Sequence, residues 1–281
     1  MLVGVRAFAL LIPMLVGGCR LNFDASTARP ADADTDADPD DAMAVPDAPG
    51  PPVVDFGAGC AVGLAMDEAS WTGAAGEIRD ACGDNNGAAV EGASRVDDPV
   101  RGTVGEVPVP SGCIKIADAP TLHATTGLTM SAWINPAALD GVNPYGVIAK
   151  RNDFTNDDAE YTMFVWIDNT VWVDLDGRND RNHGTRALIN GAWQQITVVY
   201  DGARPQAQRV AIYVDGVLDA EVPESSASLT PYASTLSIGC LPEEPSTKPQ
   251  IALGGRIDDV GVWTRAFSAQ EVTAWYVATK H

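Results

Sequence analysis

The sequence predicts an all-β fold in which two antiparallel sheets stack into a sandwich, with one short helix at the C-terminal end. Short runs rich in Val, Ile, Tyr and Trp, each ended by a turn that contains Gly or Asp, fill the last third of the chain, as in Trp193–Gly202 and Val210–Leu218. Turn signals recur at short intervals before that, which is typical of sandwiches. Helix signals are firm only at Ala269–Ala278.

Each strand is expected where an apolar or alternating run lies between turn residues. In chain order, the expected strands are Gly63–Glu68, Gly87–Glu91, Cys113–Ala117, Leu128–Asn135, Gly146–Arg151, Tyr161–Ile167, Thr170–Leu175, Gln194–Tyr200, Arg209–Val214, Thr235–Ile238 and Arg256–Trp263. The helix start is marked by a capping box of Ser268 and Glu271, with Phe267 and Val272 as the hydrophobic staple beside it.

A candidate ligand site follows from the hairpin around Asp168-Asn169, taken as a two-residue turn. Alternation then places one wholly apolar set in the core: Phe164, Trp166, Val171, Val173 and Leu175. The opposite face combines aromatic and acidic residues, and sugar sites commonly pair a flat ring with hydrogen-bonding groups. The candidate ligand set is Tyr161, Trp172, Asp174 and Asp176, with Asn179 and Asn182 from the following loop. The alternative is that Trp172 is simply packed.

The first 55 residues indicate export and attachment rather than fold. Arg6, the apolar run Ala7–Val16 and the small residues before Cys19 read as a signal peptide over residues 1–18. This end resembles the lipobox of bacterial lipoproteins, which implies lipidation of Cys19 and a place in the cell envelope, at the outer membrane or cell surface. The alternative is a plain secretory signal. Residues 19–55 then form a tether, because Asp24–Asp55 holds nine Asp and one Arg and cannot build a core.

Residues 56–281 are expected to form one acidic domain. It holds 29 of the 38 acidic residues against 15 basic ones, which excludes nucleic acid and anionic surfaces as favoured partners. Its four cysteines are Cys60, Cys82, Cys113 and Cys240, an even number that predicts two disulfides in an exported chain. Three pairings are open, and chain order alone favours Cys60 with Cys82 and Cys113 with Cys240.

Several blocks together resemble the laminin-G-like, concanavalin A-like family in its bacterial form. They are LTMSAWINP (Leu128–Pro136), GVIAKRN, GAWQQITVVYDG, VAIYVDGVL and GGRIDDVGVWTRAFSAQEV (Gly254–Val272). The match covers about Gly63 to Tyr276 and implies a jelly-roll sandwich, with Val96–Pro110 as a poorly fitting edge. The family's strand motifs also imply core positions for Trp133, Trp193, Tyr213 and Trp263.

The resemblance further implies one Ca²⁺ between the opening turn and the last strand. The matching oxygen donors are Asp80, Asp84, Asn85 and Asn86 with Asp258 or Asp259. Two alternatives stay open: Asp and Asn are common turn formers, and Asp258 could pair with an Arg on a neighbouring strand.

No catalytic motif accompanies the predicted sandwich. The E-x-D-x-x-E strand of glycoside hydrolases of this shape is missing, and His123, His183 and His281 lie in loops or at the end of the sequence. We therefore expect a non-enzymatic module on a surface lipoprotein that binds a neutral glycan, with calcium as a candidate cofactor. The alternatives are a protein-binding adhesion module, a structural envelope component and a degenerate hydrolase.

Overall fold

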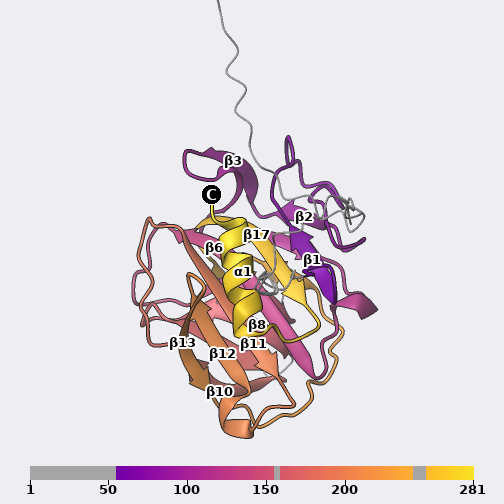
Figure 1. The fold of residues 1–281 in the computed structure, drawn as a ribbon. Helices are drawn as coiled ribbons and strands as arrows, with labels where there is room; N and C mark the ends of the chain where they lie inside the picture. Colours follow the sequence, from indigo (N-terminus) through magenta and orange to yellow (C-terminus); the bar gives the residue numbers. More distant parts are fainter. Residues whose placement is uncertain (1–54, 155–158, 243–250) are drawn as a thin grey trace, which may run out of the picture.

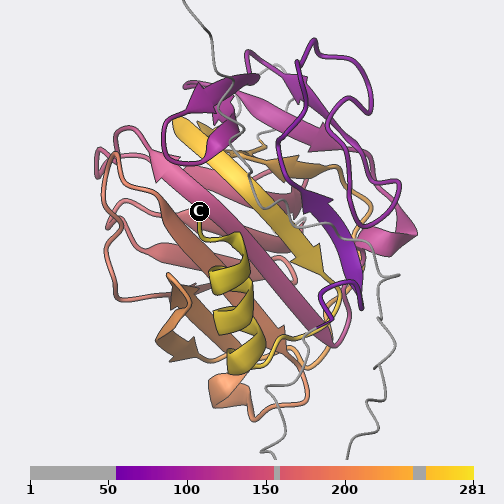
Figure 2. The same cartoon turned by 45° about the horizontal axis from the view of Figure 1, so that its top comes forward.

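The computed structural model describes residues 55–154, 159–242 and 251–281, without the side chains of residues 178–181. The predicted signal peptide, Cys19 and nearly all of the tether therefore lie outside the described residues. Within them the chain forms two large antiparallel sheets and one C-terminal helix, as the sequence predicts (Figures 1 and 2). In the same residues, no helix is both long and apolar enough to cross a membrane.

The first sheet has the strand order β13-β12-β11-β6-β17-β4-β3, and β1 also pairs with β17. Its strands are β1 (Cys60–Leu64), β3 (Ser94–Asp98), β4 (Gly102–Val107), β6 (Gly127–Pro136), β11 (Gln194–Asp201), β12 (Val210–Val214), β13 (Val217–Val222) and β17 (Gly255–Trp263). Strands β3 and β4 form a hairpin in the region that fits the family poorly. They extend the sheet beside the first residues of β17.

The second sheet has the strand order β10-β9-β8-β7-β14-β5-β2. Its strands are β2 (Gly87–Val90), β5 (Cys113–Ile116), β7 (Tyr145–Arg151), β8 (Ala159–Val165), β9 (Val171–Leu175), β10 (Arg178–His183) and β14 (Leu236–Ile238). Two short strands, β15 (Cys240–Leu241) and β16 (Ile251–Ala252), pair with each other outside it. The 3-10 turns are η1 (Pro120–Leu122) and η2 (Gln206–Gln208).

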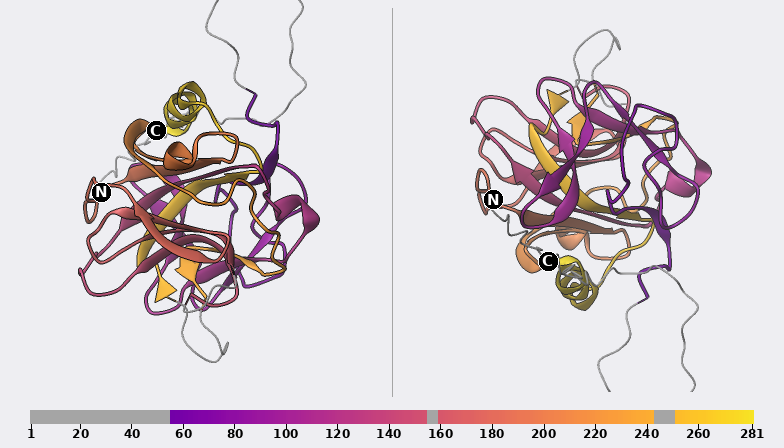
Figure 3. Two further views of the ribbon diagram at one scale, coloured as in Figure 1. Left: turned by 90° about the horizontal axis from the view of Figure 1, so that it is seen from below. Right: turned by 90° about the horizontal axis from the view of Figure 1, so that it is seen from above.

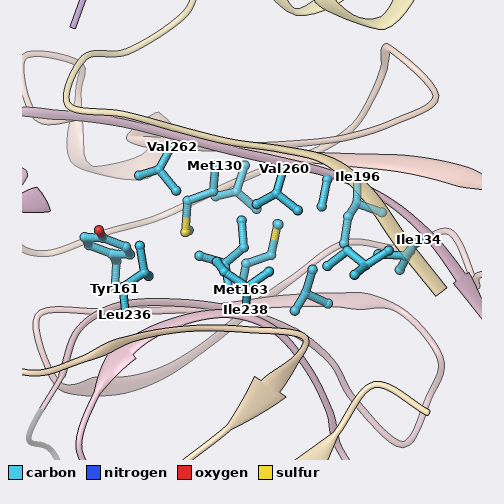
Figure 4. Close-up of a cluster of buried hydrophobic side chains, with 14 of the residues drawn as sticks. Met130, Ile134, Tyr161, Met163, Ile196, Leu236, Ile238, Val260 and Val262 are labelled. Atoms are coloured by element: carbon cyan, nitrogen blue, oxygen red, sulfur yellow. The ribbon is translucent and has the colours of Figure 1, made fainter. Parts of the chain in front are cut away.

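The core lies between the two sheets, where side chains from both interdigitate (Figure 4). Met130, Ile196 and Val262 reach in from the first sheet and meet Met163 and Ile238 from the second. All five are fully buried, and each such side chain contributes roughly 1.5–3 kcal/mol through removal of apolar surface from water. This burial holds the sandwich together.

The four cysteines pair in the order in which they occur in the chain, first with second and third with fourth. Cys60 bonds to Cys82 and ties β1 to the opening turn. Cys113 bonds to Cys240 and ties β5 to β15.

The pairing of β8 with β9 differs by one residue from the predicted register. The loop has three residues, because the Asn169 amide donates to the Trp166 carbonyl, the Trp166 amide donates to the Thr170 carbonyl, and Asn169 has a positive φ of 64°. Val165 therefore faces Val171. A slip of one residue turns every side chain of β8 to the other face. The prediction that Phe164 and Trp166 lie between the two sheets is wrong: they lie on the outer face of the second sheet, where Phe164 is nevertheless buried.

The two outer sides of the sandwich are covered differently (Figure 3). Helix α1 (Ala269–Thr279) lies over the first sheet, and its capping box forms as predicted between Ser268 and Glu271. Under the helix, Tyr213 and Trp263 are buried in a cluster with Trp275, so these residues pack on the outer face and not between the sheets. Trp133, although buried, also faces outward and stacks on Tyr276 of the helix, with ring centroids 5.6 Å apart. The β15–β16 pair lies on the opposite side of the molecule.

Candidate functional site

The outer face of the second sheet carries a group of neighbouring rings, which we call the aromatic face: Phe154, Phe164, Trp166, Trp172 and His183. They come from the turn after β7, from β8 and its loop, from β9 and from β10. Trp166 and Trp172 lie 5.7 Å apart between ring centroids, and His183 stacks on Trp172 at 4.5 Å with an angle of 12°. Edge and tilted contacts join the others.

The rings differ in exposure in a way that suits a binding surface. Phe164 is only 2% exposed and forms the floor with Leu241. Phe154, Trp166 and Trp172 are half-buried, and His183 is exposed. A buried floor with accessible rings around it is the arrangement by which apolar sites hold flat ligands.

Trp172 is held in place by the turn before it. Its indole N–H donates to Asp168, 3.1 Å from Oδ1, and the same oxygen accepts from the Thr170 amide and hydroxyl. Burial raises the pKa of Asp168, but the Thr170 and Trp172 hydrogen bonds and the nearby His183 outweigh it, so that the pKa lies below its usual value. The carboxylate therefore stays ionised at neutral pH and fixes the ring orientation.

Beside the rings lies a buried ion pair. Arg151 Nη1 is 3.3 Å from Asp174 Oδ2 and 3.3 Å from the Thr162 hydroxyl, and the guanidinium lies 5.1 Å from the Phe154 ring centroid. Its other nitrogens donate to the carbonyls of Asp153 and Phe154. Because the pair is buried and internally neutralised, it adds no net charge to this part of the face.

Of the predicted ligand set, the structure brings Trp172 and Asp174 to this face. Tyr161 is fully buried in the core, where its hydroxyl donates to the Leu122 carbonyl, so its predicted outward orientation is wrong. Asp176 accepts from Ser226 Oγ and the Thr230 amide. Asn182 is buried and donates to the Pro223 carbonyl. The side chain of Asn179 lies outside the described residues.

The sequence reasoning missed Phe154, Phe164, Trp166, Asp168 and His183 as members of the face. The register error explains Phe164 and Trp166, because both were assigned to the core. Asn169 was the available signal, since Asn favours positive φ and a three-residue hairpin loop places such a residue at its third position. For His183, which stacks across from β10, the sequence holds no local signal.

The predicted calcium donors form two clusters with different partners. In the opening turn, Asp80 accepts the backbone amides of Gly63, Cys82 and Asn85, at 2.9 to 3.0 Å. Asn86 Oδ1 accepts from the Asp80 amide, and Asp84 is exposed. Asp258 and Asp259 instead face Arg101. Burial, together with the Asp259 charge, raises the pKa of Asp258 above its usual value against the opposing effect of Arg101.

A groove of about 310 Å³ lies on the other side of the molecule, between the start of α1 and strands β11 to β13. Tyr213, Leu218 and Phe267 line its apolar part. Its two arginines already have partners. Arg204 binds Glu221 at 2.7 Å, and Arg209 donates to the carbonyl oxygens of Glu224 and Ser225, which follow β13. Tyr213 and Phe267 are at most 7% exposed, so the groove offers less accessible ring surface than the aromatic face.

Comparisons with known proteins agree with the architecture. A family model described as the concanavalin A-like lectin/glucanases superfamily matches residues 111–273. Among curated proteins, none matches the chain in sequence.

Solved structures give the same fold at low identity. Domain 4 of AbnA, a GH43 extracellular arabinanase from Geobacillus stearothermophilus solved with arabinotriose, is 14% identical with a TM-score of 0.56, over 80% of this chain and 99% of that one. A structure of botulinum neurotoxin type C, whose cell entry depends on interaction with two ganglioside molecules, is 11% identical with a TM-score of 0.58, over 79% of this chain and 52% of that one. The binding domain of Paraclostridial Mosquitocidal Protein 1 is 13% identical with a TM-score of 0.57, over 78% and 52%.

Proposed function

The chain belongs to the concanavalin A-like lectin/glucanases superfamily, and from this premise we propose that it is a non-catalytic binding module that holds a neutral glycan on its aromatic face. The observation that carries the proposal is the group of half-buried rings around Trp172, set beside an internally neutralised ion pair. Sugar rings present flat C–H surfaces to aromatic rings and hydroxyls to polar groups, and the exposed Asp168 carboxylate beside Trp172 is such a group.

One similar structure supports a neutral saccharide as ligand, and a second supports glycan binding in general, because gangliosides are acidic. The arabinanase domain was solved with arabinotriose, and the type C neurotoxin interacts with gangliosides during cell entry. The likeness of this chain to each is one of fold, so the choice of ligand depends on the aromatic face itself.

The proposal gives no residue a catalytic role. Two of the buried acids already serve as acceptors, Glu160 for His123 Nδ1 at 2.7 Å and Asp258 for Arg101 Nε at 2.7 Å. Retaining and inverting glycosidases need two carboxyl groups open to the sugar on either side of the scissile bond. Neither acid is available in that way.

The decisive variant is Trp172→Ala. We expect it to lower retention on a neutral glycan array at least about tenfold, because it removes the central ring of the face and the stacking partner of His183. The measurement is array binding followed by titration calorimetry with the best oligosaccharide. Unchanged binding would exclude the aromatic face as the glycan site.

The matched control is Tyr276→Ala, which removes a partly buried ring from the opposite side of the molecule. It should bind glycans like the wild type. The same melting temperature for Trp172→Ala as for this control would show that loss of binding is not loss of fold.

A protein ligand is the second candidate, because another similar structure is a neurotoxin binding domain in complex with rat synaptotagmin II. The groove beside α1 is the surface that would serve it. Binding to an extracellular protein that survives Trp172→Ala, with no glycan bound by the wild type, would favour this alternative.

We also propose that the domain is displayed on the cell envelope through a lipid on Cys19 and the acidic tether that follows. The support is the sequence pattern around that cysteine. In cells expressing the full chain, the protein should partition into the detergent phase, and Cys19→Ser should move it to the aqueous phase. A wild-type protein found in the aqueous phase would contradict the anchor.

A further inference from the structure

Arg101 lies at the centre of a buried cluster that the family resemblance does not anticipate. It belongs to the turn between β3 and β4, and its guanidinium contacts two carboxylates of β17. Arg101 Nε is 2.7 Å from Asp258 Oδ2, and Nη2 is 2.5 Å from Asp259 Oδ2. Its side chain is 2% exposed, and that of Asp258 is 4% exposed.

The surrounding residues hold this guanidinium in one position. Asp98 accepts the backbone amides of Val100 and Arg101, at 2.8 and 3.0 Å, which fixes the turn. The guanidinium carbon lies 4.3 Å from the Trp133 ring centroid and 5.3 Å from that of Trp193. A desolvated cation over an indole ring is stabilised by the ring quadrupole.

Arg101 also reaches the end of the helix. Its Nη2 donates to the Thr279 carbonyl at 3.1 Å, one of the carbonyls that a helix leaves without an internal partner. The Thr279 hydroxyl accepts from Trp133 Nε1 and Gln195 Nε2, both at 2.8 Å. The cluster thus ties together β17, the β3–β4 turn and the C-terminal end of α1.

A calcium ion does not fit this arrangement. Calcium binds six to eight oxygen ligands, and the two β17 carboxylates already share the Arg101 guanidinium. The opening-turn donor Asp80 is bound to backbone amides elsewhere. Charge repulsion from Arg101 opposes a divalent ion between Asp258 and Asp259.

We propose that the Arg101 guanidinium takes the place of a metal ion between Asp258 and Asp259. It then joins β17, the β3–β4 turn and the end of α1 without calcium. The same geometry contains a latent metal site. Asp258 Oδ1 is buried with no hydrogen-bond partner in the described part of the chain, and ligand atoms of Asp258, Asp259 and His281 lie within 4.8 Å of one another. Without the guanidinium, these three groups would be free to hold a divalent ion.

The test is thermal unfolding of the full chain with EDTA or with millimolar CaCl₂ or MnCl₂. The wild type should melt at the same temperature in all three solutions. Arg101→Ala should melt roughly 10 °C lower in EDTA, because the buried Asp258 and the partly buried Asp259 lose this cation, and one of the metals should restore part of the loss. A merely structural arginine would give the loss without the recovery, so an Arg101→Ala variant that no metal stabilises contradicts the proposal.

Two further arms keep the test decisive. Arg95→Ala is the matched control, because it removes an arginine of the same hairpin whose partner Asp97 is 79% exposed, and it should change neither stability nor metal response. The wild-type arm does not depend on any variant folding. Calcium stabilisation of the wild type that Asp258→Asn abolishes would overturn the proposal, whereas a wild type that calcium does not bind in calorimetry supports it.

Discussion

On the outer face of the first sheet, helix α1 covers the aromatic rings, whereas on the outer face of the second sheet the rings stay half-buried. Trp263 and Trp275 are at most 3% exposed beneath or within the helix, and Phe56 packs on Trp275 with ring centroids 5.0 Å apart. Trp166 and Trp172 have similar ring neighbours but no such cover from the described residues. The same residue types therefore stabilise the fold on one face and are available to a ligand on the other.

The buried arginines of the two sheets differ in the same way: one joins structural elements and the other leaves its surroundings accessible. On the first sheet, Arg101 joins strand, turn and helix end, so its ion pairs close the structure. On the second sheet, Arg151 pairs with Asp174 of the same sheet and leaves the rings above it accessible. A buried ion pair is weak evidence for stability by itself, and its neighbours decide what it does.

The largest expected effect is on the covered face. Trp275→Ala should lower the free energy of unfolding by about 3–5 kcal/mol, because it leaves a cavity where the ring packs on Trp263 and Phe56. Urea denaturation followed by circular dichroism measures it. Trp166→Ala, on the open face, should cost about 1 kcal/mol or less, since its ring is half-buried already.

Equal losses of unfolding free energy for Trp275→Ala and Trp166→Ala would contradict this difference, because they would mean that both faces are structural. Glycan binding by folded Trp275→Ala is the complementary readout. It should match the wild type, because the helix covers the outer face of the first sheet and the aromatic face lies on the outer face of the second.

Much of the fold could be predicted from local patterns, and the exceptions have physical causes. The capping box at Ser268 and the alternation of Val171 and Val173 are properties of a few neighbouring residues, and both predictions are confirmed. Strands β3 and β4 were missed because their sequence has mixed burial at an edge of the sheet and little apolar alternation.

The candidate site was predictable only in part. Trp172 and Asp174 follow from the period of one strand, whereas their neighbours depend on the β8–β9 register, which a single residue in the left-handed region, Asn169, shifts by one. The partner of Asp258 lies 157 residues away in the chain. Sequence reasoning kept an arginine as an open alternative but could not choose Arg101, because its strand pairing was unknown.

The smallest expected effect is a pH dependence of folding stability, to which the two sheets contribute with opposite signs. Burial lowers the pKa of Lys115, whose neighbours Ile114 and Ile116 point into the core, from 10.5 to about 8. Between these two pH values the unfolded chain holds a proton that the folded chain has lost, so stability rises with pH. The raised pKa of Asp258 acts in the other direction, because the folded chain then binds the extra proton more tightly, but it contributes equally to the wild type and to a variant of Lys115.

The difference between the wild type and a Lys115 variant therefore reports the titration of Lys115 alone. From about pH 8 to about pH 9.5 the wild type should gain about 1 kcal/mol of stability relative to Lys115→Met, measured as the difference between their urea midpoints at each pH. Burial raises the pKa of the core tyrosine Tyr200 to about 12, so its titration stays outside this range. A constant difference across the window would mean that Lys115 keeps its proton in the fold, and that the second sheet carries a largely buried positive charge there as Arg101 does on the first.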